Sequence, residues 1–224
     1  MDRVFKGQGY HLAAYIVLGA VLYLAVILLP QGHSVRWGLS TAEWIALSWV
    51  LAGIHQAWIA FFWRAELYLG KISAWFGSAG FGYYKTGYVV FGLARLLCVI
   101  PISRSSAHTD AIPPLVSVTL IVLTTPLILW VAYSFAFYFG FDRAAGADHF
   151  DPAYRDKPME TRGAFRYFRN PAYTLGLLLL YHPGLFWHSS LGLVAAAVHH
   201  AFVWVAYFCS EKPDLEAIYG DGAD

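Results

Sequence analysis

Side chains that could do chemistry cluster in two short segments near the carboxyl end of this 224-residue chain. The first, FRYFRNPAYTLG at residues 165–176, places arginines and aromatic rings ahead of an Asn-Pro pair and an apolar run. The second, EKPDLEAIYG at residues 211–220, follows directly on another apolar run. If residues 171–208 form a helical hairpin, both segments return to one surface. That surface would then present arginines, aromatic rings and a carboxylate, which suit a ligand that carries a positive and a negative charge.

The Asn170-Pro171 pair predicts the start of a helix. Asn favours the N-cap position because its side chain accepts a hydrogen bond from an early backbone N–H, and Pro suits the first helical position. The free N–H groups of such a helix would face an anion, with Arg162, Arg166 and Arg169 around them. A helical turn would place Arg166 and Arg169 on one face. The alternative is that these arginines only orient a membrane span and meet anionic lipid headgroups.

The composition indicates an integral membrane protein. Hydrophobic residues make up 58% of the chain and charged residues 13%, against about 25% charged in soluble proteins. The mean hydropathy is +0.52. A net charge of +1 offers no electrostatic basis for a nucleic-acid partner. Cys98 and Cys209 both lie in apolar segments, so we expect buried thiols rather than a disulfide.

Apolar runs predict the transmembrane elements, since roughly 20 helical residues cross a bilayer. We expect spans at residues 12–29, 42–63, 84–102, 113–141, 171–188 and 191–208, with a polar connection at 142–162 and a break at Pro183-Gly184. The predicted fold is therefore all-α: a polytopic membrane bundle of about six transmembrane helices in a single domain, residues 1–224.

The basic residues predict the orientation of this bundle. With a cytoplasmic amino terminus, only Arg36 and Arg104 face away from the cytoplasm, and Arg95 lies within a span. The other basic residues face the cytoplasm, and this bias favours placing both termini there. These residues are Arg3, Lys6, Arg64, Lys71, Lys85, Arg143, Arg155, Lys157, Arg162, Arg166, Arg169 and Lys212.

Several polar and aromatic residues inside or beside the spans have structural interpretations. Hydrogen bonds between helices are the favoured role for the embedded histidines His55, His182 and one of His199 and His200, and no metal-ligand spacing occurs. We expect Arg95 to pair with a carbonyl or with Glu43, or to line an entrance for lipid. Tryptophans near span ends fit an interfacial belt: Trp37, Trp44, Trp63, Trp75 and Trp187.

The two segments together resemble the membrane methyltransferase superfamily. Its members include phospholipid N-methyltransferases, isoprenylcysteine carboxyl methyltransferases and methanethiol methyltransferases. The family pattern is Arg-(His/Asn)-Pro-x-Tyr-x-Gly, a hairpin, then Glu-Glu-x-x-Leu-x-x-x-(Phe/Tyr)-Gly. The chain departs from it in that Gly176 comes one residue late and Lys212 stands in place of the second Glu. The matching residues are Arg169, Asn170, Pro171 and Tyr173, then Glu211, Leu215, Tyr219 and Gly220.

The resemblance implies S-adenosylmethionine as the methyl donor and a catalytic part at residues 142–224. The expected catalytic residues are Glu211 and Tyr173, and the expected substrate-binding residues are Arg162 and Arg166. The donor would be bound at the cytoplasmic face by Arg169, Asn170, Pro171, Tyr173, Gly176, Glu211 and Lys212.

The acceptor is expected to be a membrane lipid, because Glu-Lys-Pro resembles the Glu-Glu-Pro of the phosphatidylethanolamine enzymes. An ammonium acceptor must lose a proton before it attacks, and Glu211 and the histidines are the candidate bases. A thiol or an isoprenylcysteine carboxylate is the alternative acceptor. The sequence also leaves open an NADPH-dependent sterol-type reductase, whose motif carries an acidic residue where Leu177 stands here, and a non-enzymatic transport or assembly protein.

Overall fold

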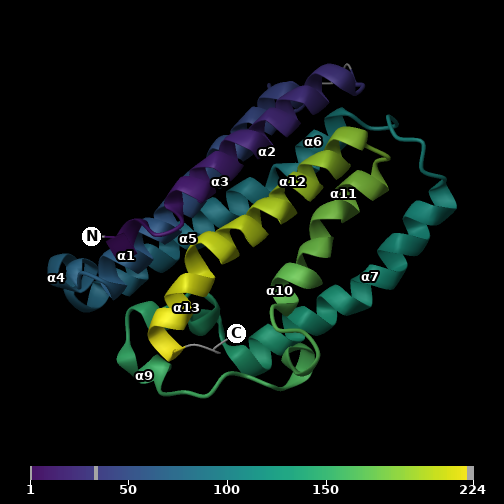
Figure 1. Ribbon diagram of the computed structural model, residues 1–224. Helices are drawn as coiled ribbons and strands as arrows, with labels where there is room; N and C mark the ends of the chain where they lie inside the picture. Colours follow the sequence, from purple (N-terminus) through teal and green to yellow (C-terminus); the bar gives the residue numbers. More distant parts are fainter. Residues whose placement is uncertain (1, 33–34, 221–224) are drawn as a thin grey trace.

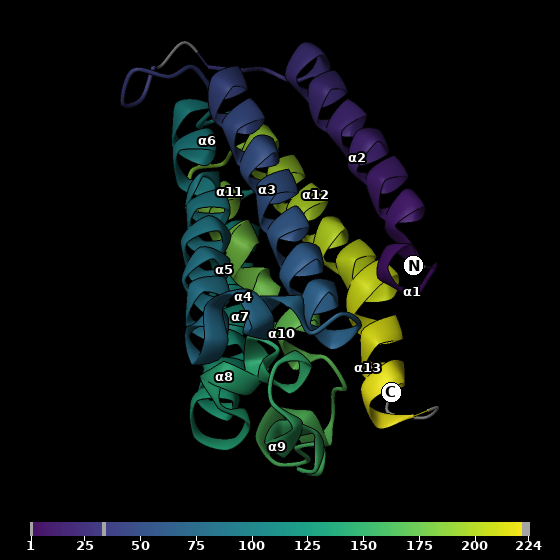
Figure 2. The same cartoon turned by 90° about the vertical axis from the view of Figure 1, so that its left-hand side faces the viewer.

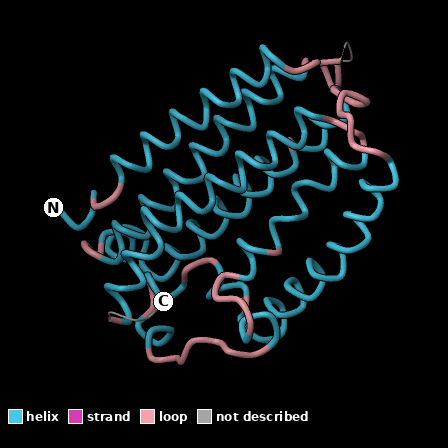
Figure 3. Tube along the Cα trace, turned by 45° about the vertical axis from the view of Figure 1, so that its right-hand side comes forward, coloured by secondary structure: helices cyan, strands magenta, loops and turns pink. Residues whose placement is uncertain are grey.

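The computed structural model describes residues 2–32 and 35–220, which form an all-α bundle without a β-strand. The long helices are α2 (Gln8–Leu28), α3 (Thr41–Leu67), α5 (Gly80–Leu97) with its continuation α6 (Val99–Ser105), α7 (Pro114–Ser134) and α12 (Ser190–Ala206). The shorter helices are α1 (Asp2–Phe5), α4 (Lys71–Phe76), α8 (Phe141–Ala144), α9 (Pro152–Arg155), α10 (Pro171–Thr174), α11 (Tyr181–Phe186) and α13 (Lys212–Tyr219). The longer loops lie at the two ends of the bundle (Figure 3).

Five helical stretches in the described part of the chain are long and apolar enough to cross a membrane. They are Arg3–Leu28, Thr41–Leu67, Lys71–Ser105, Pro114–Phe139 and Ser190–Tyr219. This confirms the predicted polytopic membrane bundle. The remaining expected span, residues 171–188, is not one helix, but its pieces run between α7 and α12 along the bundle (Figure 1).

The break in this segment differs from the one expected. It falls at Leu175, where α10 ends and the 3₁₀ helix η5 (Gly176–Leu180) begins. Pro183 instead lies in the first turn of α11, where a missing backbone N–H removes no helical hydrogen bond. The predicted interruption at Pro183-Gly184 was therefore wrong.

Both ends of the described chain lie at the same end of the bundle. Helices α1, α4, α9 and α13 gather there, whereas α6 lies at the opposite end (Figure 1). The connection from α7 to α10 also folds under this first end, with α8 and α9 below the long helices (Figure 2). The segments that carry most of the basic residues thus share one end, as the positive-inside prediction requires.

Helix α12 supplies much of the packing at the centre. Its buried face includes Leu191, Ala195 and Ala196, which pack against residues of α6 such as Val99 and Ile102. Small residues on such a face let helix backbones approach closely, which favours association where lipid replaces water. This packing places the carboxyl end of α12 beside α10.

The connection after α7, predicted to be a polar loop, is partly buried. Residues 145–149 are buried, and the ring of His149 stacks on Trp63 with centroids 4.1 Å apart. Gly146 allows this approach: its φ is 82°, and an added Cβ would lie 2.5 Å from the Trp63 ring. Trp63 is only 6% exposed, so the prediction of an interfacial role for this tryptophan was wrong. The folded connection covers it.

Candidate functional site

The two segments of the sequence meet at Tyr173 and Glu211. The Tyr173 hydroxyl donates a hydrogen bond of 2.6 Å to Glu211 Oε2, and both residues are half-buried. Tyr173 lies on α10, and Glu211 ends a π-helical stretch, Tyr207–Glu211, that joins α12 to α13. Single π turns in α-helices occur frequently at functional sites. The predicted hairpin thus brings the predicted tyrosine and carboxylate into direct contact.

Aromatic rings surround this pair. The Tyr173 ring lies edge-on to Trp204 and Tyr207, with centroids 5.9 and 6.1 Å away. The hydroxyls of Tyr84 and Tyr88 on α5 lie within electrostatic range of Glu211. Among the described residues, no lysine or arginine forms an ion pair with Glu211. The carboxylate therefore faces hydroxyl groups and aromatic rings rather than the side chain of a lysine or an arginine.

His200 on α12 holds the backbone of Tyr173. Its Nε2 hydrogen-bonds the Tyr173 carbonyl oxygen at 2.6 Å, and its Nδ1 lies 3.3 Å from the Tyr181 hydroxyl. Because α10 ends at Thr174, its last carbonyls lack helical donors. The imidazole N–H of His200 supplies a hydrogen-bond donor to this carbonyl, which matters because water does not hydrogen-bond backbone groups inside a bilayer. The histidine thus couples α12 to the position of Tyr173.

Asn170 and Pro171 do start a helix, but not in the predicted manner. The Asn170 side chain makes no capping hydrogen bond, and α10 is four residues long. The Asn170 carbonyl instead accepts a 2.7 Å hydrogen bond from the Thr174 hydroxyl. The prediction of a side-chain-capped helix was wrong here. A single turn also aligns too few peptide dipoles for the expected anion site.

The arginines of the first segment do not share a helical face. Arg166 ends the 3₁₀ helix η4 (Gly163–Arg166), and Arg169 follows in an irregular stretch, so the predicted common face was wrong. Both side chains are exposed. Arg169 has no hydrogen bond or ion pair with any other residue that the structure describes. Arg166 only approaches the ring of Tyr167, at 5.9 Å.

Arg162 is already engaged by an acidic neighbour. Its guanidinium donates to both carboxylate oxygens of Glu160, at 2.9 and 2.8 Å, and lies over the Tyr138 ring. These hydrogen bonds lower the pKa of Glu160 to about 2. A lipid phosphate would have to compete with Glu160 for this arginine.

Lys212 and Gly176, the two residues that depart from the family pattern, contact different parts of the structure. Lys212 lies 4.0 Å from Glu216, one turn further along α13. Gly176 opens η5, where an added Cβ would lie 3.4 Å from a methyl group of Val131 on α7. This is an ordinary van der Waals distance, so the packing of η5 against α7 does not itself require a glycine here.

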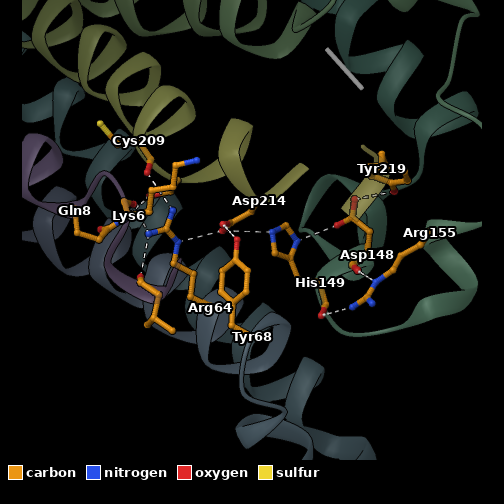
Figure 4. A network of polar contacts seen from close by, with 12 residues as sticks. Lys6, Gln8, Arg64, Tyr68, Asp148, His149, Arg155, Cys209, Asp214 and Tyr219 are labelled. Atoms are coloured by element: carbon orange, nitrogen blue, oxygen red, sulfur yellow. Dashed lines mark hydrogen bonds and ion pairs between the residues drawn. The ribbon is translucent and has the colours of Figure 1, made fainter. Parts of the chain in front are cut away.

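A buried ion pair beside the site was missed from the sequence. Arg64 on α3 donates to Asp214 on α13 at 3.2 Å, and the two residues are 1% and 0% exposed (Figure 4). Arg64 also donates to the carbonyls of Val4, Lys6 and Cys209. Tyr68 donates to the other oxygen of Asp214 at 2.8 Å. Arg64 was expected from the charge bias to lie on the cytoplasmic side; the structure adds that it ties the amino-terminal segment to α13.

This network continues into the buried connection. His149 and Asp148 share a hydrogen bond of 3.0 Å, and Tyr219 donates to Asp148 at 3.0 Å (Figure 4). Arg155 donates to the carbonyls of both Asp148 and His149. Burial alone would raise the pKa of Asp148, but the hydrogen bonds from His149 and Tyr219 hold this pKa below its usual value. The connection is thereby fastened to α13, two turns beyond Glu211.

One signal in the sequence pointed to this network. Asp214 follows Glu211 by three residues in the second segment, so a helix turns both carboxylates toward neighbouring faces. Arg64 stands at the end of an apolar span, where a basic residue ordinarily signals only topology. The residues around Arg64 do not show whether it is a topological charge or one half of a buried ion pair, because its partner Asp214 lies 150 positions away.

The histidines within the bundle make the predicted contacts between helices. His182 hydrogen-bonds Thr124 at 2.8 Å, and His199 lies 3.2 Å from the Ser48 hydroxyl. Arg95 donates to the His199 carbonyl and approaches His55, each at 3.4 Å. The carbonyl partner of Arg95 is thus confirmed. The alternative partner, Glu43, is wrong, because this carboxylate forms a capping box with Ser40.

A comparison with protein families places these observations in a class. A family model described as phospholipid methyltransferase matches residues 114–222, from the start of α7 through α13. The chain is therefore an all-α polytopic membrane bundle, and its residues 114–222, just under half of its length, are similar to the phospholipid methyltransferase family.

This match confirms the resemblance drawn from the two segments, both of which lie inside it. Neither the comparison with curated proteins nor that with solved structures gave a match.

Proposed function

We propose that the protein transfers a methyl group from S-adenosylmethionine to the amine of a phospholipid headgroup at the cytoplasmic face. The observation that carries this proposal is the contact between Tyr173 and Glu211 inside the residues that match the family. The catalytic part that we propose is residues 142–224, of which η4, α10, η5 and α11 pack against α7. A half-buried carboxylate without a basic partner is a binding group for a cationic ligand.

The side chains at this point fit such a donor. The carboxylate of Glu211 would bind the amine of the donor, and Tyr173 orients this carboxylate through the 2.6 Å hydrogen bond. The rings of Tyr173, Trp204 and Tyr207 suit a positively charged sulfur, because aromatic faces attract cations. Arg169, exposed and without a partner among the described residues, suits a carboxylate. When bound, the donor supplies a methyl group whose sulfur retains the bonding electrons as the acceptor's lone pair forms the new bond.

The remaining contribution of the chain is to hold the acceptor. Methyl transfer between positioned partners needs alignment and the exclusion of water more than it needs further reactive groups. Arg166 is exposed without an acidic partner among the described residues, and is the better candidate for a lipid phosphate. Arg162 would serve only after its release from Glu160. We therefore assign the headgroup phosphate to Arg166 first.

The test uses the purified full chain in phospholipid vesicles. We expect S-adenosylhomocysteine to raise the unfolding temperature and NADPH to leave it unchanged, because only the former carries an amino acid end. We also expect labelled methyl groups from S-adenosylmethionine to appear in a phospholipid headgroup on thin-layer chromatography. A shift with NADPH alone would favour a reductase. Label in a thiol or an isoprenylcysteine ester, or in no product, would contradict the proposed acceptor.

Two pairs of variants locate the site. Glu211→Ala and Arg169→Ala are expected to abolish S-adenosylhomocysteine binding while leaving membrane insertion intact. Glu216→Ala removes a carboxylate on α13, the helix that follows Glu211, and Arg3→Ala removes an exposed arginine at the same end of the bundle. These two controls should bind normally. Normal binding by Glu211→Ala and Arg169→Ala would reject this location.

A further inference from the structure

A groove between α2 and α3, outside the residues that match the family, contains unused binding groups. Its free volume is ≈ 460 Å³, and small-molecule sites occupy roughly 300–1,000 Å³. Leu12 on α2 and Val50, Ile54 and Ala57 on α3 give it apolar walls. Phe202 closes it on the side of α12, so the groove lies across α12 from the Tyr173–Glu211 pair.

Two largely buried polar side chains line this groove, and one of them has a buried nitrogen without a hydrogen bond among the described residues. His11 is 6% exposed and Gln56 is 7% exposed, and both line the groove. His11 Nε2 is buried and has no hydrogen bond among the described residues. Gln56 has no side-chain hydrogen bond with any described residue either. Burying a polar nitrogen without a hydrogen bond is unfavourable, so a bound group that pairs with His11 Nε2 would stabilise the folded chain.

The charge of the surroundings limits what can bind. The lining residues include no lysine or arginine, and Arg64, which lies within electrostatic range of His11, already donates to Asp214 and to three carbonyl oxygens. An anionic phosphate would therefore find no free positive charge inside the groove. An imidazole and a carboxamide can instead donate to a neutral oxygen. The binding groups thus suit a carbonyl or ester rather than a charged headgroup.

The position of the groove along the helices indicates the source of this oxygen. The lining residues of α2 run from Gln8 to Tyr15, which spans about 10 Å at 1.5 Å per residue. Gln8 begins α2 at the end of the bundle where both chain ends lie, and the apolar walls continue from there toward the middle. In a bilayer, the boundary between headgroups and hydrocarbon lies at this depth. The ester linkages of a diacyl lipid occupy this boundary.

We propose that this groove binds one acyl chain of a diacyl phospholipid, with its ester carbonyl hydrogen-bonded by His11 and Gln56. The acyl chain lies along Leu12, Val50 and Ile54, and the headgroup remains at the membrane surface. The site is separate from the proposed methyl-transfer site and does not depend on that function. It gives the amino-terminal half of the chain a specific lipid contact.

The test uses the full chain in vesicles that contain an ester-linked phosphatidylcholine with a photoreactive diazirine on one acyl chain. Cross-linked peptides are mapped by mass spectrometry in two host lipids, diester and diether phosphatidylcholine. The diether host lacks the carbonyl and competes poorly, so labelling of α2 and α3 at the groove should be roughly fivefold stronger in it, as for one hydrogen bond. Labelling of the exposed face of α7 should be equal in both hosts. Equal labelling of the groove in both hosts would overturn the proposal.

Variants separate the groove from ordinary lipid contact. Ala57→Trp fills the groove and should remove most of its labelling, whereas Ala46→Trp, at another exposed position of α3, should not. His11→Phe combined with Gln56→Leu should abolish the difference between the two hosts. Unchanged α7 labelling in each variant reports an intact fold. Groove labelling that survives Ala57→Trp, or a host preference that survives the double variant, would reject the assignment.

Discussion

The contact between Tyr173 and Glu211 joins residues 38 positions apart through one hydroxyl. Its value for ligand binding lies in orientation, because a carboxylate fixed by one donor keeps its other oxygen directed at a ligand. A hydrogen bond to a charged group contributes about 1.5–3 kcal/mol. The two side chains should therefore act on a ligand as a unit rather than independently.

A double-mutant cycle tests this coupling. Tyr173→Phe should weaken S-adenosylhomocysteine binding by roughly 5- to 30-fold, about 1–2 kcal/mol, and Glu211→Gln should weaken it further because the charge is lost. The double variant should resemble Glu211→Gln alone, since residues in contact are not additive. Titration calorimetry measures all four proteins. Strictly additive losses would show that the two side chains bind separately.

The buried ion pair between Asp214 and Arg64 is expected to make a large contribution to the free energy of unfolding. Asp214→Asn leaves Arg64 charged and buried, and breaking such a pair costs about 3–5 kcal/mol. The matched control is Asp142→Asn, which breaks the Lys85 ion pair, where the side chains are 35% and 44% exposed. Exposed pairs contribute about 0–1 kcal/mol. Denaturant unfolding in detergent should separate the two variants clearly; similar losses would contradict the buried pair.

Glu160 gives a prediction for pH. Its pKa of about 2 in the folded chain lies below the ordinary value of 4.5, so the contact with Arg162 is favoured while Glu160 is charged. This contribution is complete above about pH 4.5 and declines as the pH falls through 2. Carbon-13 NMR of labelled glutamate carboxyls should show one acid-shifted titration that disappears in Glu160→Gln. A midpoint near 4.5 for Glu160 would contradict the contact.

At the scale of elements, the break between α10 and η5 determines where Tyr173 stands. A continuous helix would pair the Tyr173 carbonyl with a backbone donor four residues later. The break leaves this carbonyl to His200, so one side chain of α12 replaces a helical hydrogen bond. The histidine is therefore a positioning residue, since it reaches the site through the backbone of α10.

Substitution of His200 tests this role. His200→Ala should destabilise the chain by about 1–3 kcal/mol and also weaken S-adenosylhomocysteine binding, because a carbonyl loses its donor and Tyr173 moves. His200→Gln retains an N–H donor and should restore much of the binding. His182→Ala is the control, since its partner Thr124 keeps a hydrogen bond to Leu120. A loss of stability without a loss of binding, or no rescue by glutamine, would contradict the positioning role.

At the scale of the whole molecule, the arrangement of the bundle predicts its orientation in the membrane. Asp156 near α9 and Ala111 before α7 are exposed and lie in connections at opposite ends of the bundle. In a chain without Cys98 and Cys209, Asp156→Cys should react with a membrane-impermeant maleimide only after cells are opened. Ala111→Cys should react in intact cells. The reverse pattern would invert the orientation, and equal reaction would contradict a spanning bundle.

Much of this fold could be predicted because hydropathy and charge bias are local properties of the chain. Apolar runs located the long helices, and the motif residues Tyr173 and Glu211 came from a resemblance confined to two short segments. The same local patterns misplaced the break in the fifth span and the cap at Asn170, because packing against α7 and α12 sets the end of α10.

The charged network shows where local patterns stop being informative. Arg64 carries the same signal in the sequence as any basic residue at a span end, yet it is buried against Asp214, 150 positions away. The sequence likewise predicted only that one of His199 and His200 contacts another helix, not that His200 bonds the Tyr173 carbonyl. Such pairs depend on which helix faces come together. Tertiary packing therefore decides which side chains pair with each other. Composition and residue spacing are enough to predict the helical bundle and the two segments that meet within it.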